Sequence, residues 1–141
     1  MRQKINFITL GVVDLQKSVD FYEKGLGWKR SEASMGDLVL FHLGGIVLAL
    51  YPRQELADDA MVENTPPSSF CGITLSLNAK SEQEVDEVLL EVSKLGATIA
   101  KPAQKVFWGG YSGYFRDPDG YLIELAHVPF WEFDENDNLK L

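Results

Sequence analysis

The chain has 141 residues, about the size of one soluble domain. Hydrophobic residues make up 45% and charged residues 24%, ordinary globular values that exclude a disordered or fibrous protein. The formal net charge of −8 argues against nonspecific nucleic-acid binding, which needs a basic surface, and suggests a cationic partner as a first hypothesis. No apolar run approaches the roughly 20 residues of a membrane helix, and the first residues do not resemble a signal peptide.

The lone cysteine, Cys71, has no second cysteine with which to form an intrachain disulfide. We therefore expect a reducing, cytoplasmic location, with Cys71 as a small buried side chain rather than a reactive one.

The first half of the chain predicts one strand, one helix and three further strands. Residues 5–13 are apolar and β-rich, and Asp14 can cap a helix that Gly25 and Gly27 end. Short β-like runs follow at 28–34, 38–43 and 46–51, separated by turn residues. The predicted order is βαβββ.

A polar stretch of 17 residues, 53–69, contains Pro66-Pro67 and no clear periodicity. It is long for a loop inside one compact unit, so we interpret it as a linker between two modules.

The second half predicts the same order again. A strand at 70–78 precedes Ser81-Glu82-Gln83-Glu84, a capping box that opens a helix ending at Gly96. Short strands are predicted at 98–100, 106–108, 114–116 and 121–128, with a turn at 117–120.

Three sequence matches in the same order indicate an internal duplication. Residues 8–12 match 73–77, Leu26-Gly27 matches Leu95-Gly96, and residues 45–50 match 120–125. We predict an α+β fold of two tandem βαβββ modules that form a curved, mostly antiparallel sheet around a cleft. The expected parts are module one at 1–52, the linker at 53–69, module two at 70–131 and an acidic tail at 132–141.

The residues of both modules resemble a known superfamily. The matching segments are 9–18, Phe21-Tyr22 and 25–27 in module one, and 117–125 in module two. They look like the vicinal oxygen chelate superfamily, which includes glyoxalase I, extradiol dioxygenases, and fosfomycin- and bleomycin-resistance proteins. The resemblance covers most of the chain and implies the fold, but not the reaction, because one fold hosts many functions.

The resemblance also implies where metal ligands would stand, on the first and last strands of each module. Those positions hold Phe7 and Ala49 in module one, and Gly72 and Glu124 in module two. One carboxylate is too few for Zn²⁺ or a hard cation. We therefore expect no metal and no other cofactor.

The other potential metal ligands of the chain do not replace the missing ones. Strand alternation places His127 on the face opposite Glu124, and Cys71 on the face opposite Gly72. The facing of His42 cannot be read from the sequence, so it stays a stray ligand or a surface residue.

Without metal ligands, the cleft would be roomier and more apolar at Phe7, Ala49 and Gly72. Residues 107–115 combine aromatic side chains with three glycines. Such a segment suits the wall or lid of a ligand pocket, although an aromatic core with turn glycines has the same composition. The expected ligand-binding residues of this segment are Phe107, Trp108, Tyr111 and Tyr114.

Glu124 and Arg116 complete the candidate site. Glu124 would act as a general base or as an anchor for a cationic or hydrogen-bonding ligand, unless it is a relic carboxylate paired with a neighbour such as Arg116. Arg116 either touches the ligand or makes a salt bridge beside the 117–120 turn.

These residues are compatible with two functions. A metal-free binder of an aromatic or amphipathic small molecule, similar to the bleomycin-resistance branch, is the preferred interpretation. The alternative is a glyoxalase-like lyase, isomerase or related enzyme that uses Glu124 as a base or as its sole metal ligand.

A homodimer is expected because the modules can pair within or between chains. The aromatic residues of segment 129–133 should dock on the domain or on a partner subunit, with a free tail as the alternative.

The charge is unevenly distributed along the chain. The linker 53–69 and the tail 132–141 each carry a net charge of −3. The acidity thus describes solubility more than recognition, and the cationic-partner hypothesis rests on Glu124 alone.

Overall fold

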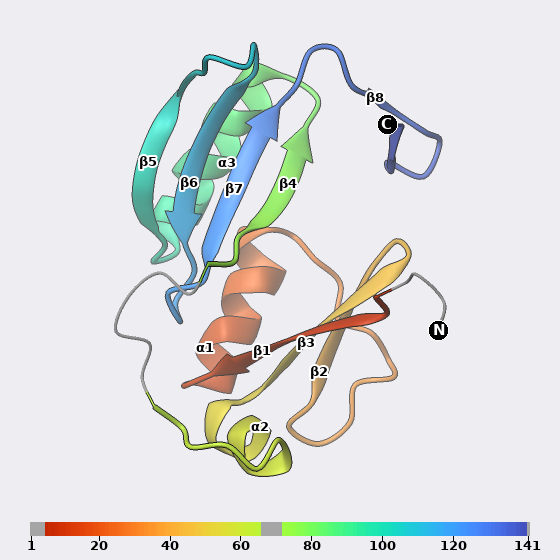
Figure 1. The fold of residues 1–141 in the computed structure, drawn as a ribbon, viewed down its shortest axis with the longest axis vertical. Coiled ribbons are helices and arrows are strands. Elements are labelled where there is room, and N and C mark those ends of the chain that lie inside the picture. The colour runs from red at the N-terminus through yellow and green to blue at the C-terminus, as the bar shows by residue number, and fades with distance from the viewer. Residues whose placement is uncertain (1–4, 66–71, 141) are drawn as a thin grey trace. The chain divides into compact units, whose positions relative to one another are not determined.

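The computed structural model describes residues 5–65 and 72–140. The chain divides into two compact units, Met1–Ser69 and Phe70–Leu141, and each unit has its own sheet (Figure 1). None of the helices in the described ranges is long and apolar enough to cross a membrane.

The first unit contains a three-stranded sheet in the order β1-β3-β2. The strand β1 runs parallel to β3, and β2 runs antiparallel to β3. The elements, in chain order, are β1 (Phe7–Val12), α1 (Leu15–Asp20), the π-helical turn η1 (Phe21–Gly25), β2 (Val39–Leu43), β3 (Ile46–Pro52) and α2 (Arg53–Asp59).

Local signals set the ends of the first helical segment as predicted. The carboxylate of Asp14 accepts a hydrogen bond of 3.0 Å from the backbone N–H of Lys17, which satisfies one free donor of the first turn. After η1, Gly27 adopts a φ of +67°, which an L side chain rarely adopts. Tyr22 of this segment packs its ring 5.3 Å from that of Trp28 and 6.0 Å from that of Phe41 in the core.

Two sequence predictions for this unit are wrong. The predicted strand 28–34 makes only an isolated bridge, between Arg30 and Phe41, so the first unit is βαββ followed by a helix. That helix, α2, occupies the start of the predicted linker, where its apolar Leu56 packs close to Gly11 of β1. A Cβ on Gly11 would lie 3.2 Å from a Leu56 methyl group, so the lack of a side chain there lets the helix approach the strand.

The second unit contains a four-stranded sheet in the order β4-β7-β6-β5 and a short β8-β9 pair. The strands β4 and β7 are parallel, whereas the other pairs are antiparallel. The elements are β4 (Leu75–Ala79), α3 (Glu82–Lys94), β5 (Thr98–Lys105), β6 (Tyr111–Arg116), β7 (Leu122–His127), β8 (Glu132–Phe133) and β9 (Leu139–Lys140).

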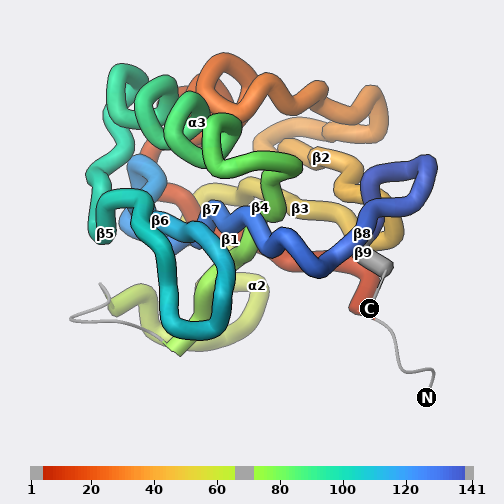
Figure 2. The backbone as a smooth tube through the Cα atoms, turned by 90° about the horizontal axis from the view of Figure 1, so that it is seen from above, coloured from red at the N-terminus to blue at the C-terminus, as the bar shows by residue number. Residues whose placement is uncertain are grey.

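The helix α3 covers one face of this sheet (Figure 2). The Ser81 hydroxyl accepts from the Glu84 N–H at 3.1 Å, and the Glu84 carboxylate accepts from the Lys80 N–H at 2.6 Å, so the predicted cap is present. The buried residues of the helix are Val85, Leu89 and Val92. The sheet face toward α3 presents Phe115, Ile123 and Leu125, which leaves the alternate residues of these strands on the open face.

The predicted strand at 106–108 is wrong, because these residues belong to the turn between β5 and β6. The α+β class itself is confirmed. In both units the first strand pairs in parallel with a later strand of the main sheet, β1 with β3 and β4 with β7, a similarity that is consistent with a duplicated module.

Candidate functional site in the second unit

Three polar side chains lie in one row across the open face of the second sheet. Register pairs Glu124 of β7 with Ser76 of β4 on one side and with Tyr114 of β6 on the other. Because paired residues of adjacent strands share a face, the three side chains converge on the face opposite α3.

A hydrogen bond from the neighbouring strand orients the Glu124 carboxylate. The Ser76 hydroxyl donates to Oε2 of Glu124 at 3.1 Å. Tyr114 stands on the other side, where burial, and then the interaction of its hydroxyl with the Glu124 carboxylate, raise the pKa of Tyr114. The carboxylate is therefore held as an oriented acceptor.

A lysine stands on the far side of Tyr114 from Glu124. The ammonium of Lys101, on β5, donates to the Ser112 hydroxyl at 3.0 Å and lies 5.3 Å from the centroid of the Tyr114 ring. The tyrosine ring thus separates the lysine charge from the carboxylate.

A cavity of about 490 Å³ opens above this row. Its polar lining comes from the sheet, whereas three large aromatic side chains come from the loops beside it. The lining residues are Ser76, Asn78, Trp108, Tyr114, Glu124, Ala126, Val128, Phe130 and Trp131.

The β5–β6 loop supplies Trp108. Two backbone hydrogen bonds close this loop, from the Val106 N–H to the Gly110 carbonyl and from the Gly109 N–H to the Val106 carbonyl, both 3.0 Å. The loop projects on the side of the sheet opposite α3 (Figure 2). The indole of Trp108 occupies the space that a Cβ on Gly110 would fill, so the indole can lie there only because Gly110 has no side chain.

The segment after β7 supplies the other two aromatic side chains. A turn closed by the Trp131 N–H on the Val128 carbonyl at 3.1 Å holds Phe130 and Trp131, whose ring centroids lie 6.3 Å apart, edge to face. Phe130 also approaches the neighbouring loop, since a Cβ on Gly109 would lie 3.5 Å from its ring. Phe130 and Trp131 therefore pack on their own unit.

Several predicted site residues of module two lie elsewhere. Phe107 is fully exposed and does not line the cavity. The Tyr111 hydroxyl donates to Asp86 of α3 at 2.9 Å, a bond that raises the pKa of Tyr111 and places it on the helix side. Arg116 donates to the Gly120 carbonyl at 2.9 Å, so it supports the turn.

The predicted residues Phe7, Ala49 and Gly72 do not line this cavity either. Phe7 and Ala49 share one face of the first sheet, where Phe7 is half-exposed and Ala49 is buried. Gly72 lies before β4 with a φ of +80° and open space around it.

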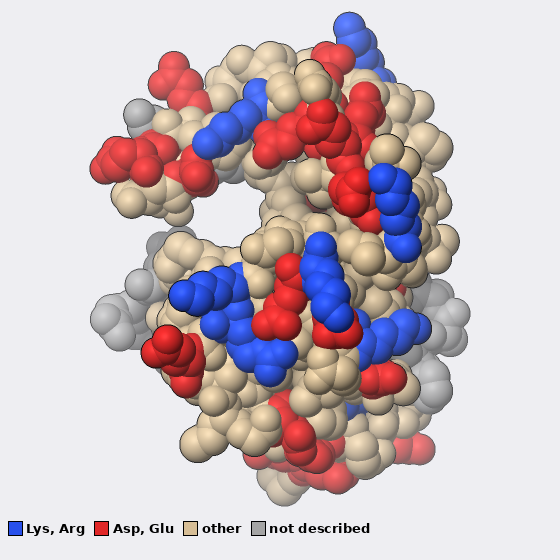
Figure 3. Space-filling model, turned by 180° about the vertical axis from the view of Figure 1, so that it is seen from behind, with Lys and Arg blue, Asp and Glu red and all other residues tan. Residues whose placement is uncertain are grey.

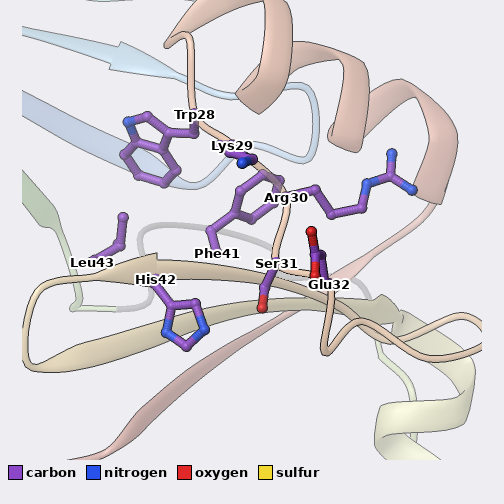
Figure 4. Close-up of a pocket in the computed structure, with 8 residues that line it drawn as sticks. All are labelled: Trp28, Lys29, Arg30, Ser31, Glu32, Phe41, His42 and Leu43. Atoms are coloured by element: carbon purple, nitrogen blue, oxygen red, sulfur yellow. The ribbon is translucent and has the colours of Figure 1, made fainter.

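The first unit has a hollow of its own, also of about 490 Å³ (Figure 4). Arg30 points away from it toward Glu23, to which its guanidinium donates at 3.1 and 3.3 Å. The ring of His42 lies on the opposite side of β2 from Phe41. The polar side chains that line this hollow do not converge on one point, whereas those of the cavity in the second unit converge at Glu124.

A family model places the chain among known proteins. Residues 4–125 match the glyoxalase/bleomycin resistance protein/dioxygenase superfamily. The chain belongs to this superfamily.

Superfamily relatives cover nearly the whole chain. A glyoxalase-related enzyme from Fulvimarina pelagi has a similar structure, with a TM-score of 0.90, 31% identity and 99% of each chain covered. The metallothiol transferase FosB of Lysinibacillus sphaericus is 30% identical over 87% of this chain and 81% of its own length. The glutathione transferase FosA of Serratia marcescens is 30% identical over 91% of this chain and 82% of its own length.

The donor set of this superfamily member does not fit the metal ion that the resemblance implies. The four corresponding positions hold a ring, a methyl group, a hydrogen and the Glu124 carboxylate. His127 lies on the α3 side, with Nδ1 3.2 Å from the Ala79 carbonyl oxygen. Within residues 5–65 and 72–140, no group of three or more His, Cys, Asp or Glu side chains is arranged to hold a metal ion.

Sequence reasoning missed part of the cavity wall of this superfamily member. Ser76 and Asn78 alternate along β4 and face the same side as Glu124, but their signal is visible only once β4 is paired with β7. Phe130 and Trp131 stood out as aromatic residues, but their sequence position does not reveal that they lie beside the β5–β6 loop.

Proposed function

We propose that this superfamily member binds a small molecule, without a metal ion, in the cavity of its second unit. One observation carries the proposal: a single cavity combines the rings of Trp108, Phe130 and Trp131 with an oriented polar row at Glu124. Ligand sites typically pair large apolar contact faces with a few fixed polar groups. The expected ligand is a small aromatic or amphipathic compound.

Substitution of Trp108 tests the cavity, and Phe107 provides a matched control in the same loop. Compounds of a small-molecule library that raise the melting temperature of the protein should lose this effect in W108A. F107A removes a fully exposed ring that does not line the cavity, so it should respond like the wild type. Equal responses of W108A and the wild type to every stabilising compound would overturn the proposal.

Elemental analysis tests the metal-free part of the proposal. Protein purified without chelators should contain far less than one Zn, Ni, Fe or Mn ion per chain, because one carboxylate cannot hold such an ion tightly. Stoichiometric metal that persists through gel filtration would contradict this expectation.

Catalysis with Glu124 as general base is the second candidate. The observation that favours it is the position of the carboxylate in the cavity wall, hydrogen-bonded to the Tyr114 hydroxyl. If the protein turns over a compound that it binds, E124Q should abolish turnover and retain binding of a neutral substrate. Unchanged turnover in E124Q would exclude this role.

A homodimer in the cytoplasm completes the proposal. Support for the location comes from the single cysteine, since disulfides are rare in that compartment.

A further inference from the structure

The charges around the cavity of the second unit are unbalanced. Glu124 is the one residue with a formal charge among the nine that line it. Lys101 does not line the cavity, and its ammonium is already engaged by the Ser112 hydroxyl and the Tyr114 ring. Among the residues that line the cavity, Glu124 thus has no oppositely charged partner.

The aromatic lining adds to this negative character. Four of the nine residues are aromatic, namely Trp108, Tyr114, Phe130 and Trp131. The faces of aromatic rings carry partial negative charge and attract cations, and indole rings do so most strongly. Two of the four rings are indoles.

The hydrogen bonds of Glu124 leave room for a ligand. A carboxylate offers about four acceptor positions. The Ser76 hydroxyl occupies one of them, and Tyr114 is the neighbour of Glu124 on the other strand. The remaining positions are free to accept from a protonated amine, and the negative charge attracts a quaternary ammonium that has no N–H to donate.

We propose that the ligand of this cavity is an organic cation, a quaternary ammonium or protonated amine attached to an apolar body, which rests on the proposed function above. The ammonium group would lie against the aromatic rings and the Glu124 carboxylate. An anion would meet the repulsion of the carboxylate, and a neutral molecule would lack the attraction between opposite charges.

Three probes of nearly the same shape separate charge from shape. Choline is the cation, 3,3-dimethylbutan-1-ol is its neutral isostere, and 3,3-dimethylbutanoate is the anion. Titrations followed by the indole N–H signals of Trp108 and Trp131 in NMR spectra should give choline at least tenfold tighter binding than the alcohol. The anion should not bind.

The outcomes distinguish this inference from the proposed function. Trp108-dependent binding of the alcohol or the anion as tight as that of choline would overturn the cation preference and leave the cavity as a binding site. No binding by any of the three probes would count against both the cation preference and the proposed site.

A pair of charge-neutralising variants tests whether the effect is local. E124Q should weaken choline binding at least tenfold and should weaken binding of the alcohol far less, because the alcohol carries no charge. E87Q removes one negative charge from the exposed surface of α3, on the other side of the sheet, and should leave choline binding unchanged. Equal loss in both variants would show a general effect of net charge and would overturn the inference.

Discussion

At the residue scale, the position of Trp108 depends on the absence of a side chain at Gly110. The substitution G110A would force the indole out of the space it occupies. Because the colliding atoms belong to one side chain of a surface loop, we expect a small change in stability but a loss of choline affinity of about tenfold. Indole NMR shifts of Trp108 report its displacement.

Gly45 provides the control for this substitution, since it also lies in a turn between two strands but has open space around it. G45A should leave both the indole shifts and the probe affinity as in the wild type. An unchanged Trp108 signal in G110A would contradict the expected displacement.

Tyr114, also at the residue scale, makes a pH-dependent contribution to the stability of the fold. Burial and the hydrogen bond to Glu124 raise its pKa above the usual value of about 10. The stability that its protonated form contributes is complete below about pH 10 and is lost as the pH rises through the raised pKa. A ¹³C NMR titration of the tyrosine Cζ atoms, with Y114F to assign the signal, measures this pKa.

In E124Q the pKa of Tyr114 should fall toward the usual value without reaching it, because burial remains. The same titration curve in E124Q and in the wild type would show that the carboxylate does not act on the phenol.

At the scale of the elements, Ser81 supports the start of α3. Its hydroxyl accepts from the Glu84 N–H, so S81A leaves a donor of the first turn without this partner. We expect a loss of about 1 kcal/mol in the free energy of unfolding, measured by urea denaturation. S81D, which restores an acceptor, should recover most of the loss, and equal stability of S81A and the wild type would contradict a capping role.

The helices and strands also show which structural elements can be predicted from sequence patterns. The caps at Asp14 and Ser81 were predictable because their hydrogen bonds join residues three positions apart. The prediction of a strand at 28–34 was wrong because a β-like composition does not guarantee a neighbouring strand to pair with. Within this segment only Arg30 forms a β-bridge, to Phe41. The helix α2 was missed because its packing against Gly11 involves residues distant in the sequence.

The candidate site also contains residues that the sequence could predict and residues that only the structure shows. Sequence reasoning found Glu124, Trp108 and Tyr114 from their residue types and from the resemblance. It could not supply Ser76, because a serine on a strand becomes informative only when the register places it beside a carboxylate.

At the scale of the whole molecule, some of the acidic side chains lie together away from the cavity. They gather over α3, on the face of the second unit opposite Glu124, where red side chains predominate in Figure 3. The acidic residues of this helix are Glu82, Glu84, Asp86, Glu87 and Glu91. We therefore expect the net charge of −8 to act on solubility more than on recognition.

The assembly of the molecule stays a prediction, as does the cleft between the modules. We expect a dimer, so light scattering coupled to gel filtration should give twice the 15.8 kDa mass of one chain. The mass should hold on tenfold dilution if the dimer is stable. A mass of one chain at all concentrations would contradict the dimer.

The parallel pairing of β4 with β7 has a consequence for folding kinetics. The helix α3 and the β5–β6–β7 meander form from residues that are close in sequence, whereas Ser76 meets Glu124 across 48 residues. Contacts of such separation carry a larger loop-closure entropy and form late. We therefore expect β4 to join last and the cavity to be completed only in the final step, so recovery of ligand binding during refolding should lag behind the return of helical signal.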